Sequence, residues 1–128
     1  MNKPSIGFIG TGRIAQALIS GLAKTPGNAI AGYDKELSAL QGVADRFGIG
    51  MAASIPELAE KASILVIAVK PYQVAEVLAE LKPALGGNHL VVSVAAGIST
   101  GFIESSCPQG TRVIRVMPNT PAFVGMGM

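Results

Sequence analysis

The sequence of 128 residues contains no tryptophan, one cysteine and one histidine, and only 14% of its residues are charged. The single cysteine, Cys107, excludes an intrachain disulfide framework and is typical of a reducing compartment. No cluster of His, Cys, Asp or Glu has metal-ligand spacing, so the sequence predicts no metal site. The net charge of +2, with ten scattered Lys and Arg residues, provides no electrostatic basis for binding nucleic acid or a membrane surface.

Long apolar runs are also missing. No stretch approaches the roughly 20 apolar residues that span a bilayer. The run Ile6–Ile9 is too short for a signal peptide and ends at Gly10. We therefore expect a cytoplasmic protein without membrane contact. Hydrophobic residues are abundant at 49%, which argues against disorder and predicts one folded domain over residues 1–128.

Apolar runs alternate with helical patterns along the chain. Five short runs are typical of strands buried on both faces, namely 5–10, 29–34, 63–69, 89–95 and 112–117. Apolar residues at helical spacing predict helices near 14–22, 37–47, 54–61 and 74–81, and a short one between Ser99 and Pro108. Ser54 is the expected N-cap of its helix, with Glu57 reaching back. The alternation predicts an α/β protein with a doubly wound, mainly parallel sheet and helices on both faces.

The first candidate site is the segment Gly10-Thr11-Gly12-Arg13-Ile14-Ala15, which follows a predicted strand and begins a predicted helix. In this context a G-x-G-x-x-A pattern indicates dinucleotide binding. Gly10 would allow the tight turn, Gly12 would let a pyrophosphate approach the backbone, and Ala15 would permit close helix–strand packing. The unpaired N–H groups and the positive end of the helix dipole would hold the phosphates. The alternative is a glycine turn without a ligand.

The second candidate is Asp34, at the end of the second predicted strand and about 20 residues after Gly12. A carboxylate there can bind both hydroxyls of an adenosine ribose and repel a 2′-phosphate, which favours NAD. Lys35 and Arg13 favour NADP instead, since either could pair with that phosphate. Asp34 could also simply form a turn. The sequence leaves these alternatives open.

Two further segments end predicted strands at the edge of the sheet where ligands lie in open α/β proteins. In Ala68-Val69-Lys70-Pro71, the proline begins the next helix and aims Lys70, unless this is a solvent-exposed lysine. In Val94-Ala95-Ala96, small side chains leave room for a flat ring, although close backbone packing explains them equally well. His89 begins a strand at the opposite edge, so we expect a surface or locally hydrogen-bonded histidine. Without a Ser–His constellation or carboxylate pair, any chemistry belongs to a cofactor.

Four segments together resemble the N-terminal half of the pyrroline-5-carboxylate reductases, in this order: IGFIGTGRIAQALISGL, VIAVKPYQVAEVL, LVVSVAAGIS and RVIRVMPNTPAFVGMGM. The resemblance covers essentially the whole chain. Many dehydrogenases share the glycine loop, whereas the Lys70-Pro71 corner and the segment Met117–Pro121 are far more specific. The resemblance implies a Rossmann-like fold, NADP or NAD as the cofactor, and reduction of 1-pyrroline-5-carboxylate to L-proline by hydride transfer to its C=N bond.

The resemblance also implies where the cofactor lies. The pyrophosphate would be held by Ile9, Gly10, Thr11, Gly12, Arg13 and Ile14. The adenosine ribose would meet Tyr33, Asp34 and Lys35. The nicotinamide side would be lined by Ala68, Val69, Lys70, Pro71, Val94, Ala95 and Ala96, with Asn119 close to nicotinamide and substrate. The chain departs from the family at Ser54-Ile55, where members often carry an asparagine near the adenine, and at Asp34, where members have a serine or a basic residue.

Such enzymes continue for a comparable length as a helical domain that dimerises and completes the substrate pocket. The resemblance therefore implies a fragment of a homo-oligomeric enzyme, inactive alone, and it assigns no catalytic proton donor to this chain. Two alternatives remain open. One is another two-domain dehydrogenase, acting on β-hydroxy acids or on a deazaflavin. The other is a non-catalytic nucleotide-sensing module, since a fold alone does not prove turnover.

Overall fold

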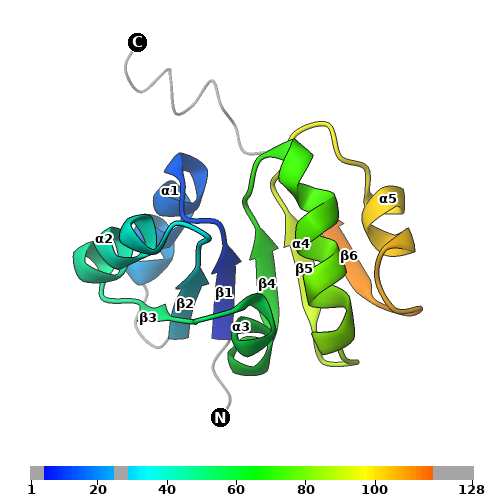
Figure 1. The fold of residues 1–128 in the computed structure, drawn as a ribbon, viewed down its shortest axis with the longest axis horizontal. Helices are drawn as coiled ribbons and strands as arrows, with labels where there is room; N and C mark the ends of the chain where they lie inside the picture. The colour runs from blue at the N-terminus through cyan, green and yellow to red at the C-terminus, as the bar shows by residue number, and fades with distance from the viewer. Residues whose placement is uncertain (1–4, 25–28, 117–128) are drawn as a thin grey trace.

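The structure, a computed structural model, describes residues 5–24 and 29–116, which contain a sheet of six strands (Figure 1). The strands are β1 (Ser5–Ile9), β2 (Ala29–Tyr33), β3 (Gly50–Met51), β4 (Ile64–Ile67), β5 (Leu90–Ser93) and β6 (Arg112–Arg115). They lie in the order β3-β2-β1-β4-β5-β6, and every pair of neighbours is parallel. The predicted α/β class with a parallel sheet is confirmed.

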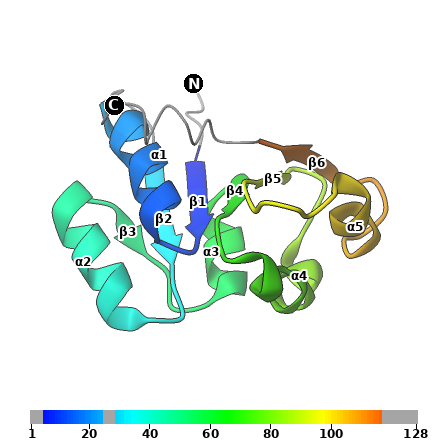
Figure 2. The ribbon, with the colours of Figure 1, turned by 90° about the horizontal axis from the view of Figure 1, so that it is seen from above.

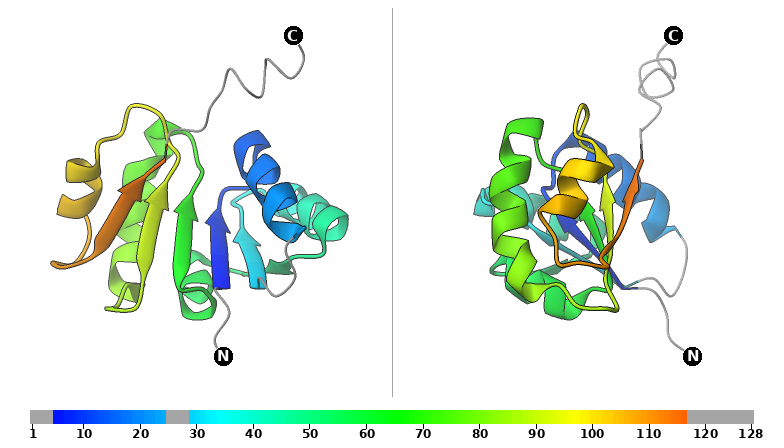
Figure 3. Two further views of the ribbon diagram at one scale, coloured as in Figure 1. Left: turned by 180° about the vertical axis from the view of Figure 1, so that it is seen from behind. Right: turned by 90° about the vertical axis from the view of Figure 1, so that its right-hand side faces the viewer.

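Five helices and two short 3-10 turns connect the strands. The helices are α1 (Arg13–Ala23), α2 (Leu37–Phe47), α3 (Ile55–Lys61), α4 (Val74–Leu81) and α5 (Thr100–Ser105). The 3-10 turns are η1 (Pro71–Gln73) and η2 (Lys82–Ala84). Helices α1 and α4 lie on opposite faces of the sheet, as Figures 2 and 3 show. The sheet is therefore covered on both faces, as a doubly wound fold requires.

The core consists of two apolar clusters, one on each face of the sheet. Helices α3, α4 and α5 pack against the first, and α1 and α2 pack against the second. Strand β4 contributes to both, because its side chains alternate between the faces: Leu65 and Ile67 join the first cluster and Val66 the second. Burial on both faces explains why this strand reads as a continuous apolar run.

A glycine brings α3 close to the central strand. A Cβ added to Gly7 of β1 would lie 2.8 Å from Leu58 Cγ on α3, so a larger residue would push the helix outward. The N-cap of α3 is Ser54, as predicted, because its Oγ accepts from the Glu57 N–H at 3.2 Å. The expected return bond differs. Glu57 Oε1 accepts from the N–H of Ala53, one residue before the cap, at 3.2 Å.

The predicted strands extend too far at their carboxyl ends. The run 63–69, for example, forms a strand only over Ile64–Ile67, because Ala68 and Val69 leave the sheet and line the cleft described below. Strand β3 was not predicted, since two residues carry no alternation to recognise. Ser99 caps α5 through its Oγ, which accepts from the Phe102 N–H at 3.1 Å.

His89 and Cys107 both lie outside the cleft described below. His89 Nδ1 accepts from the Gly86 N–H at 2.8 Å, and its Nε2 lies 2.7 Å from the Ala59 carbonyl oxygen, so the predicted local bonding is confirmed. Cys107 is buried, and that burial raises the pKa of its thiol, which keeps the thiol protonated and unreactive. Within residues 5–24 and 29–116, no helix has the length and apolarity needed to cross a bilayer.

Candidate functional site

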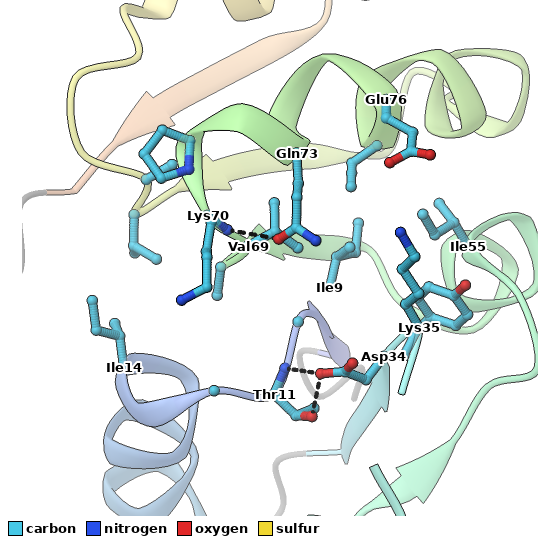
Figure 4. A pocket seen from close by; sticks show the side chains of 18 of the residues that line it. Ile9, Thr11, Ile14, Asp34, Lys35, Ile55, Val69, Lys70, Gln73 and Glu76 are labelled. Atoms are coloured by element: carbon cyan, nitrogen blue, oxygen red, sulfur yellow. Dashed lines mark hydrogen bonds between the residues drawn. The ribbon is translucent and has the colours of Figure 1, made fainter. Parts of the chain in front are cut away.

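A cleft of about 620 Å³ opens at the carboxyl ends of β1, β2, β4 and β5 (Figure 4). Every predicted cofactor residue that the structure describes lines this cleft: Ile9, Gly10, Thr11, Gly12, Arg13, Ile14, Tyr33, Asp34, Lys35, Ala68, Val69, Lys70, Pro71, Val94, Ala95 and Ala96. Asn119 lies outside the described residues. Segments far apart in the sequence therefore converge on one site.

The position of the cleft follows from the strand order. Strand β1 lies between β2 and β4. The chain adds β2 and β3 on one side of β1, and then adds β4, β5 and β6 on the other side. At such a switch point the loops after adjacent strands separate and leave a crevice, which is where ligands bind in open α/β sheets. The cleft at β1 is the crevice that this rule describes.

Gly10 is required by the turn that leaves β1. Its φ is +97°, and a Cβ there would lie 2.8 Å from the Ala68 carbonyl oxygen. Its N–H donates to the Tyr33 carbonyl oxygen at 2.8 Å, which ties the turn to the end of β2. The predicted tight turn is confirmed, and only glycine satisfies both its backbone conformation and its contact with β4.

Gly12 differs from Gly10, because nothing lies within 4 Å of an added Cβ. The space beside it belongs to the cleft, at the N-terminus of α1. The first bond of that helix is from the Gln16 N–H to the Gly12 carbonyl oxygen, at 2.9 Å. Within the described part of the chain, the N–H groups of Gly12, Arg13 and Ile14 have no acceptor. These donors and the helix dipole form a site for an anion.

Asp34 points toward the glycine loop, as Figure 4 shows. Its Oδ2 accepts from the Thr11 N–H at 2.8 Å and from Thr11 Oγ1 at 2.7 Å. Its Oδ1 accepts from the Glu36 N–H at 2.8 Å. The carboxylate therefore joins the end of β2 to the turn between β1 and α1, an arrangement that the sequence did not indicate.

The β4 side of the cleft carries small apolar residues and one cation. Ala95 is buried and Ala96 is exposed, and both line the cleft just after the end of β5. The Lys70 N–H donates to Gln73 Oε1 at 3.1 Å, which fixes the corner that Pro71 begins. In Figure 4 the Lys70 side chain extends into the cleft toward Ile14. Lys70 is also exposed, so the alternative of a solvent-exposed lysine stays open.

The sequence analysis missed one wall of the cleft. The added lining residues are Glu36, Ile55 and a stripe on η1 and α4 formed by Gln73, Glu76, Val77 and Glu80. The spacing of that stripe, at i, i+3, i+4 and i+7, is one helical face and was visible in the sequence. Figure 4 shows Glu76 and Lys35 extending toward one another across the cleft. The adenosine side of the predicted site is therefore rich in charge of both signs.

Comparison with known proteins identifies the family of this chain. Residues 5–97 match the sequence model of a family described as NADP oxidoreductase, coenzyme F420-dependent. A pyrroline-5-carboxylate reductase of Escherichia coli is 38% identical over 130 residues, which cover 98% of this chain and 48% of that protein. One from Corynebacterium melassecola is 40% identical over 129 residues, covering 97% of this chain and 48% of that protein.

Solved structures give the same result. A pyrroline-5-carboxylate reductase from Coxiella burnetii superposes with a TM-score of 0.88 at 34% identity, over 96% of this chain and 47% of that one. The Plasmodium falciparum enzyme, solved with NADP bound, gives a TM-score of 0.76 at 30% identity, over 98% of this chain and 46% of that one. A prephenate dehydrogenase from A. aeolicus, at 15% identity and a TM-score of 0.78, shares the fold alone.

The chain spans about half the length of the curated relatives it matches, since it covers 48% of the Escherichia coli protein. The family model covers most of the chain, and the curated relatives that match almost the whole chain are named pyrroline-5-carboxylate reductase. The chain therefore belongs to the NADP oxidoreductase family that this model describes, and within it the chain corresponds to the N-terminal, dinucleotide-binding half of pyrroline-5-carboxylate reductases.

Proposed function

We propose that this chain is the NAD(P)H-binding domain of an enzyme that reduces 1-pyrroline-5-carboxylate to L-proline. The observation that carries the proposal is the convergence of the described cofactor segments on one cleft at the switch point of the sheet. The relatives matched over almost the whole chain are named for this reaction. The proposed compartment is the cytoplasm.

The residues of the cleft fit a dinucleotide. The open space at Gly12 and the unpaired N–H groups at the start of α1 suit the pyrophosphate. Tyr33, Lys35 and Ile55 would surround the adenosine. At the other end, the small side chains of Ala95 and Ala96 would lie against the nicotinamide ring. When bound, the reduced nicotinamide supplies the hydride.

The contribution of this chain to the reaction would be orientation and exclusion of water. The corner at Lys70-Pro71 is fixed by the bond from the Lys70 N–H to Gln73 Oε1, so it would hold one edge of the nicotinamide site in place. Asn119 would lie near nicotinamide and substrate. A helical second domain would dimerise, make the enzyme a homo-oligomer, and supply the remaining substrate ligands.

The test is a proline-forming assay on the full-length protein with NADPH and with NADH. Saturable, substrate-dependent oxidation of either cofactor is expected, and the 128-residue chain alone should bind dinucleotide but form no measurable proline. A parallel assay with coenzyme F420 tests the deazaflavin alternative that the family description raises. Turnover with that coenzyme and none with NADPH or NADH would contradict the proposal. Dinucleotide binding by a full-length protein that lacks turnover would favour the sensing module.

A further inference from the structure

We propose that Asp34 is a positioning residue for the glycine loop, and that Lys35, rather than Asp34, distinguishes a 2′-phosphate from a 2′-hydroxyl on the bound dinucleotide. The inference rests on the proposed function, because it concerns how the same cleft selects its cofactor. It reverses the simplest interpretation of an acidic residue at the end of the second strand, where a carboxylate usually favours NAD.

The first argument is the number of acceptor sites that Asp34 has left. A carboxylate offers about four lone-pair sites. Three are taken, by the Thr11 N–H at 2.8 Å, by Thr11 Oγ1 at 2.7 Å and by the Glu36 N–H at 2.8 Å. Binding both hydroxyls of a ribose needs two acceptor sites that face the ligand. Asp34 could offer them only by giving up bonds that the protein already makes.

The second argument is that the bonds between Asp34 and Thr11 hold the glycine loop in place. Thr11 is only 2% exposed, so its N–H and hydroxyl need acceptors within the protein. Asp34 satisfies both from a position 23 residues away in the sequence, across the gap between two strands. The phosphate-binding turn is therefore fixed before a ligand arrives, which lowers the entropic cost of binding. The bond from the Thr11 N–H to Asp34 directs this donor away from the phosphates. The phosphates would therefore be bound by the N–H groups of Gly12 and the residues after it.

The third argument concerns the exposure and the charge of Lys35. It is exposed, it lines the cleft, and its side chain extends into the adenosine end (Figure 4). In the described part of the chain its ammonium group lies within no salt bridge. Glu76 and Glu80 line the same end and would oppose a 2′-phosphate. Lys35 thus provides a positive charge there that can offset their repulsion, so its removal should change cofactor choice.

The experiment measures affinities of the 128-residue chain for NADPH and NADH by calorimetry. Asp34→Ser should weaken both about tenfold and leave their ratio unchanged, because it removes charge-assisted bonds that hold the loop. Lys35→Met, which keeps the length of the side chain, should weaken NADPH about fivefold and leave NADH unchanged. Lys24→Met is the matched control, since Lys24 is exposed at the far end of the 11-residue helix α1 and should change neither affinity.

A second measurement needs no ligand. Hydrogen exchange of the Thr11 amide should be slow in the wild-type chain and faster in Asp34→Ser. Asp34→Asn keeps one accepting oxygen and should partly restore both the slow exchange and the affinity. An NADPH/NADH affinity ratio that rises severalfold in Asp34→Ser, or a ratio that Lys35→Met leaves unchanged, would overturn the inference. Wild-type protein that binds neither dinucleotide would contradict the proposed function instead, while unchanged Thr11 exchange in Asp34→Ser would contradict the positioning role.

Discussion

The two halves of the cleft differ in the residues that line them and in the bonds between those residues. On the β1–β2 side, polar groups are bonded to one another: Asp34 accepts from Thr11, and Gln16 Nε2 donates to the Thr11 carbonyl oxygen at 2.9 Å. On the β4–β5 side, the lining is short and apolar, with Ala68 and Ala95, and Lys70 reaches into the open space (Figure 4). The first half is organised for a ligand in advance. The second offers a surface against which a ring and a further domain could pack.

Gly10 connects the two halves. Its N–H bonds to Tyr33 of β2, while its α-carbon lies so close to β4 that a Cβ would touch the Ala68 carbonyl oxygen. The Ala68 N–H in turn donates to the Ile9 carbonyl oxygen at 2.8 Å. Because the same turn meets both neighbouring strands, a change at Gly10 should disturb the whole cleft. A change in one half alone should affect one end of the dinucleotide.

The largest expected effect is from Gly12→Asp, which should weaken dinucleotide binding by at least about a hundredfold. The new carboxylate would stand where the pyrophosphate is proposed to lie and would repel it. Nothing lies within 4 Å of a Cβ at Gly12, so the variant should fold. Calorimetry gives the affinity, and Gly42→Asp, at an exposed glycine of α2 with equally open surroundings, is the control. Unchanged affinity in Gly12→Asp would contradict the assignment of the phosphate loop.

Next in size is Gly10→Ala, which should lower the free energy of unfolding by about 2 kcal/mol or more. An alanine at a φ of +97° is strained, and its Cβ would also collide with the Ala68 carbonyl oxygen at 2.8 Å. Urea denaturation measures the loss. Gly48→Ala is the comparison, because Gly48 has a φ of +71° but nothing near its Cβ. Equal losses of unfolding free energy in Gly10→Ala and Gly48→Ala would show that the close approach of Gly10 to Ala68 adds nothing to the cost of the substitution.

A change confined to the second half should separate the two ends of the ligand. Ala96 is exposed at the end of β5, so Ala96→Leu should occupy the space proposed for nicotinamide without disturbing the core. NADH should then bind about tenfold more weakly, because a steric overlap of this kind typically costs 1–3 kcal/mol. ADP, which lacks the nicotinamide, should bind as it does to the wild type. A parallel loss of ADP affinity would show that the halves are not independent.

Some residues of this site could be predicted from the order of strands and helices in the sequence. Others could not, because they depend on side-chain contacts that the sequence does not show. Gly10, Gly12 and Lys70 could be placed because they lie in the segments that follow parallel strands, and the carboxyl ends of such strands meet at one edge of the sheet. The bond between Asp34 and Thr11 could not, since it depends on side-chain rotamers brought together across 23 residues. The acidic stripe with Glu76 was missed for a related reason. An apolar face shows which side of a helix is buried, but not whether its neighbouring face meets a cleft or solvent.

The smallest expected effect concerns α3, whose first residue, Ile55, lines the cleft at its proposed adenosine end. Glu57 on this helix accepts from Lys61 Nζ, at 3.2 Å, and from the Ala53 N–H, and both bonds lower the pKa of its carboxyl group from the ordinary value of 4.5. A carboxyl whose pKa is lower in the folded state stabilises the protein above the unfolded pKa, and this contribution is lost as the pH falls through the folded value.

Glu57→Gln should therefore lower the urea midpoint slightly at pH 7, and the difference from wild type should shrink as the pH falls through the lowered pKa of Glu57 in the folded state. The glutamine keeps an oxygen that can accept from the Ala53 N–H, so the variant mainly removes the charge. Lys61→Met should produce a loss with the same pH dependence, because it removes the other partner of the ion pair. Dinucleotide affinity at pH 7 should be unchanged in both variants, since neither residue lines the cleft. A difference in urea midpoint that does not shrink as the pH falls would mean that Glu57 stabilises α3 through its shape and not through its charge. A fall in affinity would mean that the proposed adenosine end depends on α3 more than its contacts indicate.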